Sequence, residues 1–88
     1  MVSKKVTVIN KQGFHMRPAK DFVAEMAKFK SDINLIVGGK KANGKSIMNI
    51  MAACIKCGME VEVCCEGEDE QAMLDRAVEL IESGLGEE

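Results

Sequence analysis

An alternating segment in the last third of the chain places the strongest limit on the fold. Successive residues of a β-strand point to opposite faces of a sheet. In residues 59–66 one set of alternate positions is apolar and the other is mostly acidic: Met59, Val61, Val63 and Cys65 against Glu60, Glu62, Cys64 and Glu66. The pattern predicts a strand with one buried face and one face in water, and therefore a sheet that is covered on one side only.

Other periodicities along the chain predict the remaining elements. Period-two alternation predicts strands at residues 5–10 and 33–37, and Gly38-Gly39 predicts a hairpin that leads to a short strand at 40–43. Apolar residues spaced three and four apart predict helices at 16–29, 47–55 and 70–83. The last helix should bury Met73, Leu74, Ala77, Val78 and Ile81 and end at Gly84.

The order β-α-β-β-α-β-α predicts an α+β fold. We expect an open-faced two-layer sandwich, in which three helices cover one face of a four-stranded antiparallel sheet. A chain of 88 residues is long enough for one such core, so we expect a single domain over residues 1–88. Its apolar runs are too short to span a bilayer and no export signal is apparent, which predicts a cytoplasmic protein with no membrane insertion.

Charge is distributed unevenly along the chain. Through Gly58 there are 11 Lys and Arg residues against 3 Asp and Glu, and from Met59 onward there is 1 against 11, giving net charges of +8 and −10. The basic part should attract an acidic partner. Nucleic acid is disfavoured as that partner, because the acidic part repels phosphates and the chain has no Trp or Tyr for base stacking.

The segment 13–19 is the best candidate for a working site. It holds the only histidine and the only proline of the chain, His15 and Pro18. Pro18 suits the first turn of a helix, which places His15 at the helix N-terminus, where the amides of Met16 and Arg17 and the helix dipole favour an anion such as phosphate. Histidine can form covalent intermediates, and the Arg17 guanidinium can bind phosphoryl oxygens. The alternative is an N-cap histidine beside a surface arginine.

Two motifs give the chain a close resemblance to HPr, the histidine-containing phosphocarrier family of the bacterial phosphoenolpyruvate-dependent sugar phosphotransferase system. Residues 13–19, Gly-Phe-His-Met-Arg-Pro-Ala, resemble the family's active-site motif, and residues 43–51, Asn-Gly-Lys-Ser-Ile-Met-Asn-Ile-Met, resemble its second signature. Met16 and the pair Lys20-Asp21 depart from the usual residues, which bears on the choice of partner.

The resemblance implies a carrier rather than an independent enzyme. His15 would accept a phosphoryl group on Nδ1 from enzyme I and transfer it to the IIA domains of sugar permeases, with Arg17 as the assisting cation. The resemblance also implies that the first strand lies beside the fourth, with the second between the fourth and the third. We expect no cofactor, no metal and a monomeric protein.

Ser46 has a structural and a regulatory interpretation. Its position before residues 47–55 predicts an N-cap, which contributes roughly 1 kcal/mol relative to alanine. The resemblance implies a second role as the site phosphorylated by HPr kinase/phosphorylase in hosts that have it. The alternative function is a regulatory binding module of the same fold, acting on a catabolite-control transcription factor through phospho-Ser46.

The predicted helix 47–55 is apolar on nearly all sides. If Ile50 and Cys54 face the sheet, an outward patch remains for partners, and methionine suits a surface that meets several partner shapes. We therefore predict a partner-binding surface made of Met16, Lys20, Lys45, Ile47, Met48 and Met51. The alternative is a wholly buried helix.

The four cysteines favour a plain interpretation as small apolar residues in a reducing compartment. Cys64 and Cys65 are consecutive in a strand and should face opposite sides, so they cannot both bind one metal ion. A thiol or metal module remains the third hypothesis, with the Cys54/Cys57 pair as its site.

Overall fold

A computed structural model describes residues 1–11 and 13–85. The predicted order of elements is confirmed. The elements are β1 (Val2–Thr7), α1 (Met16–Met26), β2 (Asp32–Val37), β3 (Lys40–Asn43), α2 (Ile47–Ala52), β4 (Glu60–Glu66) and α3 (Glu70–Glu82). None of the helices in these two ranges has the length and apolarity that a bilayer crossing requires.

The four strands form one antiparallel sheet in the order β1-β4-β2-β3, as the resemblance implied. β4 lies inside the sheet and pairs on one side with β1, from Val2 opposite Cys65 to Thr7 opposite Glu60. On its other side β4 pairs with β2, where Leu35 lies opposite Val63. The hairpin β2–β3 completes the sheet through the Gly38-Gly39 turn.

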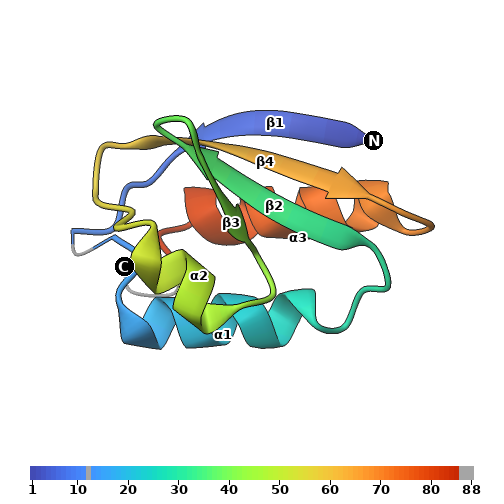
Figure 1. Ribbon diagram of the computed structural model, residues 1–88, viewed down its shortest axis with the longest axis horizontal. Coiled ribbons are helices and arrows are strands. Elements are labelled where there is room, and N and C mark those ends of the chain that lie inside the picture. The colour runs from blue at the N-terminus through green and yellow to red at the C-terminus, as the bar shows by residue number, and fades with distance from the viewer. Residues whose placement is uncertain (12, 86–88) are drawn as a thin grey trace.

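The three helices cover one face of this sheet (Figure 1). Between the two layers lies a single cluster of buried apolar side chains, to which every strand and helix contributes. Its largest fully buried members include Phe22 from α1, Ile33 and Leu35 from β2, Ile50 from α2 and Met73 from α3. The predicted two-layer α+β architecture is therefore confirmed.

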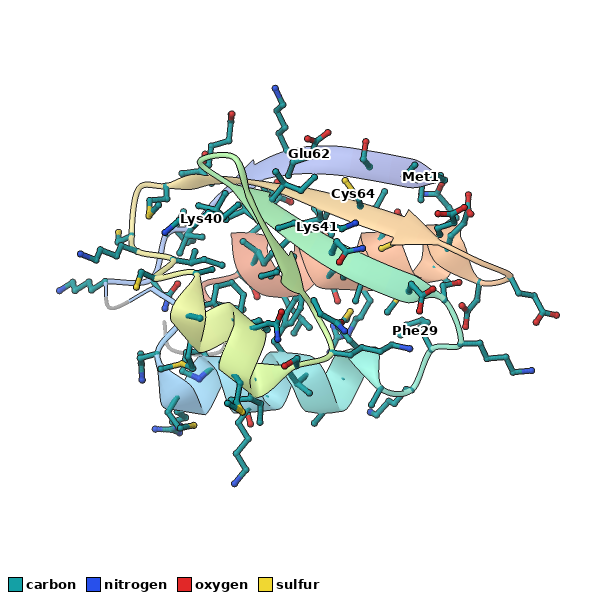
Figure 2. The ribbon with its side chains drawn as sticks, in the orientation of Figure 1. Met1, Phe29, Lys40, Lys41, Glu62 and Cys64 are labelled. Atoms are coloured by element: carbon teal, nitrogen blue, oxygen red, sulfur yellow. The ribbon has the colours of Figure 1, made fainter. Side chains whose placement is uncertain are left out.

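The opposite face of the sheet carries polar and charged side chains (Figure 2). The pairing registers place a row of four residues across it: Lys41, Ile36, Glu62 and Lys5, one from each strand. Within this row Lys5 and Glu62 are opposite charges on neighbouring strands, a pairing that stabilises a sheet. This face matches the glutamate side of the alternation in residues 59–66.

β1 differs from the predicted first strand, which was placed at residues 5–10 and therefore three residues too late. The regular ladder with β4 begins at Val2 and ends at Thr7. Lys4 lies on the helix-facing side of β1, where an alternating strand usually has an apolar residue. The sequence pattern therefore did not show that the strand begins before Lys5. Val8 is still buried, and it is held by two backbone hydrogen bonds outside the ladder, to Met59 (3.0 Å) and Gly58 (2.8 Å).

The helices end earlier than their periodicity predicts. α1 ends at Met26 rather than at residue 29, because the chain tightens into a turn in which the Phe29 amide donates to the Met26 carbonyl (3.1 Å). α3 ends one residue early, at Glu82, and Gly84 follows with φ of 84° as the predicted C-terminal stop.

A cluster of hydrogen bonds joins the turn after α1 to the start of α3. The Asp69 carboxylate accepts from the Lys30 amide (3.0 Å), the Ser31 amide (2.9 Å) and the Ser31 hydroxyl (2.5 Å), and the Asp69 amide donates to the same hydroxyl oxygen (3.0 Å). The hydroxyl bond from Ser31 is the largest of the effects that lower the pKa of Asp69 to about 2. This Ser31–Asp69 cluster fixes the far end of α1, away from His15.

Candidate functional site

The loop that carries His15, residues 13–15, is fixed by backbone hydrogen bonds. The Gly13 amide donates to the Asn10 carbonyl (3.0 Å), and the Asn10 side-chain amide donates back to the Gly13 carbonyl (2.5 Å). The Phe14 amide donates to the carbonyl of Ile55 (3.0 Å), in the segment that follows α2. The N-terminus of α1 is thus tied to the end of α2, and Gly13 takes φ of 65° to allow it.

Phe14 anchors this loop to the core. Its side chain is buried and meets the Phe22 ring edge to face, with ring centroids 5.3 Å apart and an angle of 89° between the planes. Such aromatic pairs contribute about 0.5–1.5 kcal/mol beyond the burial of their area. Phe14 points into the core, and the residue after it, His15, is half-buried at the N-terminus of α1.

His15 is the N-cap residue of α1, with extended backbone angles (φ −86°, ψ −174°). The Ala19 amide donates to the His15 carbonyl (3.0 Å), which begins the helix. The imidazole does not form a capping hydrogen bond. The predicted position at the helix N-terminus is therefore confirmed, and because Arg17 is exposed, the same geometry also fits the alternative of an N-cap histidine beside a surface arginine.

The amides of Met16 and Arg17 follow His15 in the first turn of α1. Neither has an acceptor among residues 1–11 and 13–85, as expected for the first N–H groups of a helix. These groups and the positive end of the helix dipole favour an anion beside the half-buried His15. The Arg17 side chain is exposed and has no ion pair within the described ranges, so its guanidinium can reach an anion placed there.

Ser46 caps α2 as predicted. Its hydroxyl oxygen accepts from the Asn49 amide (3.2 Å) and from the Asn49 side-chain amide (3.0 Å). Figure 1 shows α2 crossing over α1, with the end of α2 toward the start of α1, in agreement with the Phe14–Ile55 bond. Since α2 has six residues, Ser46 lies about 9 Å along that helix from the end nearest the His15 loop.

α2 is shorter than predicted and is not wholly buried. It ends at Ala52, and Cys54 has φ of 53°, which is not compatible with a continued helix. The expectation that Cys54 faces the sheet is therefore wrong, because its side chain is exposed. Ile50 alone among the α2 residues is buried, as predicted.

Five of the six predicted partner-binding residues lie on α1 and α2. Met48 and Met16 are large exposed apolar side chains, 81% and 57% accessible. Ile47 and Met51 are half-buried, and Lys20 is exposed on α1. α1 and α2 contact one another, so these side chains lie on adjoining helices.

Lys45, the sixth predicted partner-binding residue, forms a contact within the protein. Its ammonium group donates to the carbonyl of Phe29 (2.9 Å), in the turn after α1. Nothing in the sequence pattern signals this bond, since the acceptor is a backbone atom distant in the chain. The hydrogen bond from Phe14 to the backbone carbonyl of Ile55 was not predicted for the same reason. The role of Asn10 in holding Gly13 could have been predicted, because asparagine before a glycine is typical of a turn.

The four thiols are free, and Cys64 and Cys65 lie on opposite faces of β4 as predicted. Cys65 is buried and Cys64 is half-buried on the other face of the strand. Burial raises the pKa of Cys65 to about 11 and also raises the pKa of Cys64, so both are protonated at neutral pH. Cys54 and Cys57 are exposed, and within residues 1–11 and 13–85 no group of three or more metal-ligating side chains occurs.

Comparison with known proteins agrees with the resemblance carried by the motifs at residues 13–19 and 43–51. Residues 2–83 match the family model PTS-HPr, described as "PTS HPr component phosphorylation site". The HPr-like protein Crh of Bacillus subtilis (strain 168) is 43% identical over 82 residues, which cover 93% of this chain and 96% of that protein. Phosphocarrier protein HPr of Treponema pallidum (strain Nichols) is 41% identical over 88 residues and covers 100% of both chains.

Solved structures give the same result. The crystal structure of HPr-C-His from Thermoanaerobacter tengcongensis has a TM-score of 0.95 and 42% sequence identity, over 100% of this chain and 99% of the other. The resemblance inferred from the sequence motifs is therefore confirmed.

Proposed function

Since the chain belongs to the HPr family of phosphocarrier proteins, we propose that it carries a phosphoryl group on His15 between enzyme I and the IIA domains of sugar permeases. The observation that carries this proposal is the position of the chain's only histidine at the N-terminus of α1, beside the amides of Met16 and Arg17. We place this activity in the cytoplasm, where both partners would be reached.

The protein takes part in the transfer as a covalent carrier. A nitrogen of His15, Nδ1 by resemblance, attacks phosphorus as the bond from phosphorus to the donor group breaks, and the reverse exchange delivers the group to the acceptor. Phosphoryl transfer depends mainly on positioning and charge stabilisation. The fixed loop positions the imidazole, and the helix N-terminus and the Arg17 guanidinium stabilise the phosphoryl oxygens.

Docking would use the surface that α1 and α2 share. Met16 and Met48 present exposed apolar side chains, and Ile47, Met51 and Lys20 extend this surface. One flexible apolar surface can meet a donor and several acceptors of different shape. Lys45 would contribute mainly by holding the turn after α1, because its ammonium group already binds Phe29.

A phosphotransfer assay tests the proposal. The protein should acquire one acid-labile, base-stable label from phosphoenolpyruvate in the presence of enzyme I, and His15→Ala should acquire none. Arg17→Lys keeps the charge but loses the planar donor fork, so it should accept the label more slowly. A label that persists in His15→Ala would remove the basis for the assignment.

A second function, regulatory binding through phospho-Ser46, is favoured by the similarity to the HPr-like protein Crh. The presence of His15 favours the carrier role over a dedicated regulator, and both roles can coexist. An ATP-dependent kinase that labels the wild type but not Ser46→Ala would support the regulatory role.

Ser46→Asp tests how the two sites affect each other. A phosphate or aspartate about 9 Å along α2 from the helix end nearest the His15 loop should repel an acidic donor, and salt should screen the effect, since the Debye length is about 8 Å at physiological ionic strength. Ser46→Asp should therefore slow labelling of His15 at low salt and less at high salt. Equal slowing at all salt concentrations with a lower melting temperature would indicate a conformational effect instead.

A further inference from the structure

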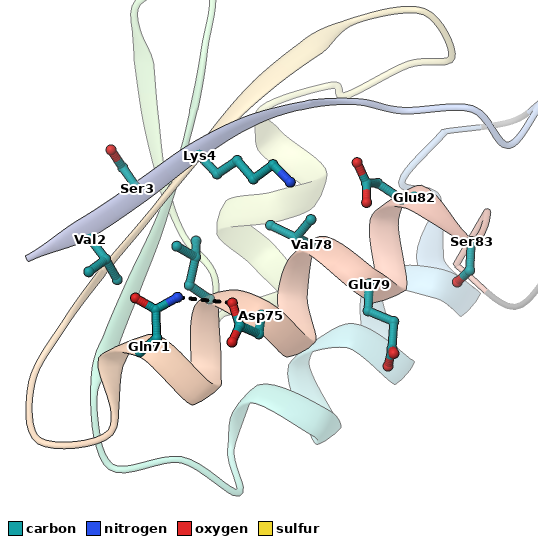
Figure 3. A pocket seen from close by; sticks show the side chains of 10 residues that line it. Val2, Ser3, Lys4, Gln71, Asp75, Val78, Glu79, Glu82 and Ser83 are labelled. Atoms are coloured by element: carbon teal, nitrogen blue, oxygen red, sulfur yellow. Dashed lines mark hydrogen bonds between the residues drawn. The ribbon is translucent and has the colours of Figure 1, made fainter.

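A second surface of the molecule has features of a binding site. A groove with a volume of about 890 Å³ lies between β1 and α3 and is lined by residues of these two elements and by Ser83 (Figure 3). Its lining includes apolar side chains from both elements, namely Val2, Leu74 and Val78. The groove contains no residue of the surface proposed for phosphotransfer.

β1 provides a free strand edge beside this groove. It is the first strand in the order β1-β4-β2-β3, so within residues 1–11 and 13–85 only its inner side is paired, with β4. Figure 3 shows β1 running alongside α3, with Val2 pointing toward the helix and Ser3 pointing to the other face. An exposed strand edge is a template for one more strand. A strand added here would lie over the groove, with alternate side chains directed toward α3.

The charges of the groove indicate which kind of peptide segment it can bind. Three carboxylates of α3 line it, at positions 75, 79 and 82. Glu82 has no hydrogen bond or ion pair within the described part of the chain, Asp75 accepts from the side chain of Gln71 (2.9 Å), and Glu79 pairs with Arg76. The helix advances about 6 Å from position 75 to 79, which is close to the 6.6 Å between same-face residues of a strand, and about 4.5 Å from 79 to 82, which is about 2 Å shorter.

We propose that the groove between β1 and α3 binds an extended basic segment of a partner protein. The segment pairs with the outer edge of β1 and directs arginine or lysine side chains at alternate positions toward Asp75, Glu79 and Glu82. The aliphatic stems of those side chains cover Val2 and Val78 while their charged ends reach the carboxylates. This site leaves the surface around Met16 and Met48 accessible, so the segment binds without blocking phosphotransfer.

A capped eight-residue peptide that alternates arginine with threonine is a suitable probe. It should bind saturably at low ionic strength, and its binding should increase the hydrogen-exchange protection of β1 amides. Two further peptides carry methyl groups on alternate backbone nitrogens, in the two possible phases. Only the phase that leaves the β1-facing N–H groups intact should bind, because the other cannot form the strand pairing. Charge and composition are the same in both methylated peptides.

Charge variants locate the site. Glu82→Gln should weaken peptide binding roughly two- to five-fold, as expected for one exposed ion pair, while Glu68→Gln, outside the groove, should have a smaller effect. Lys4→Gln should strengthen binding, because Lys4 lines the groove, and Lys5→Gln on the opposite face of β1 provides the matched control.

Three outcomes would overturn the proposal. The first is the absence of saturable binding at low ionic strength. The second is equal binding of the two methylated peptides, which would indicate attraction by net charge without strand pairing. The third is equal weakening by Glu82→Gln and Glu68→Gln. Phosphotransfer to His15 should continue with the peptide bound, and a peptide that abolishes it would also contradict the proposed location.

Discussion

Replacing Gly13 with alanine should destabilise the protein much more than the same replacement at an exposed glycine. A Cβ atom at Gly13 would lie 2.4 Å from the carbonyl oxygen of Ile55 and 2.7 Å from Cα of Lys56, both backbone atoms. Ordinary contact begins at 3.4 Å, so the His15 loop and the segment after α2 must separate by about 1 Å. The Phe14–Ile55 hydrogen bond, now 3.0 Å, would then be lost.

The expected magnitude follows from two contributions. A left-handed backbone costs alanine about 1–2 kcal/mol, partly offset by about 0.4–1 kcal/mol from the stiffer unfolded chain. Leaving the Phe14 amide without its acceptor adds about 1–3 kcal/mol. We therefore expect Gly13→Ala to lower the free energy of unfolding by about 2–4 kcal/mol, which a small domain with 5–15 kcal/mol of stability can survive.

Gly38→Ala is the matched control. Gly38 has φ of 55°, near the 65° of Gly13, but a Cβ atom there meets nothing within 4 Å. Only the backbone contribution remains, so its destabilisation should be about 1 kcal/mol or less. The difference between the two variants isolates the contact with Ile55.

Urea unfolding of the two variants, followed by far-ultraviolet circular dichroism, measures this difference when the m values agree. If the proposed function holds, Gly13→Ala should also accept phosphoryl groups more slowly, while Gly38→Ala should match the wild type. Equal destabilisation of the two variants would refute the reasoning. It would mean that the segment after α2 moves away from the added methyl group without a cost in free energy.

Three further predictions concern stability. Ser46→Ala should lower the free energy of unfolding by about 1 kcal/mol through loss of the α2 cap, whereas Ser46→Asp should retain the cap; equal loss in both variants would contradict the capping role. Ile50→Ala should cost about 2–5 kcal/mol because this side chain is fully buried, and Met48→Ala, two residues away and 81% accessible, should cost less than about 0.5 kcal/mol in the same unfolding experiment. The pKa of Asp69 is lowered from 3.8 to about 2, so its stabilisation is present above pH 3.8 and is lost as the pH falls through about 2. Asp69→Asn should thus have a lower melting temperature at neutral pH and a flatter decline between those two pH values, and a decline as steep as that of the wild type would contradict this.

Most of the fold could be predicted from the sequence because its elements are locally consistent. β2 and β4 alternate, α1 and α3 have apolar stripes, and Ser46, Pro18 and Gly84 mark helix ends by local chemistry. The limits of β1 and α2 could not be predicted, because they depend on tertiary partners. Lys4 faces the helix layer at a sheet edge, where it is tolerated, and the chain after Ala52 is directed by the bond between Phe14 and Ile55.

The candidate site shows the same division. His15 and Arg17 could be chosen from the sequence because a rare residue, a proline and a helix start coincide. The sequence gives no sign that Lys45 binds the Phe29 carbonyl or that Asp69 holds Ser31, since both contacts join segments far apart in the chain. Partners of backbone carbonyls are set by the fold and carry no side-chain signal.

The pairing of β1 with β4 affects the order in which the protein can form during synthesis. β1 ends at Thr7 and β4 begins at Glu60, so at about 5–20 residues per second the ribosome makes the two strands about 3–10 seconds apart. In that interval α1 and the β2–β3 hairpin can form from local contacts, while β1 has no strand to join. Lys4 and Lys5 place like charges in the middle of the waiting strand, which opposes its association with the same segment of another nascent chain. Chains that stop before residue 60 should therefore remain incomplete and be readily degraded by proteases.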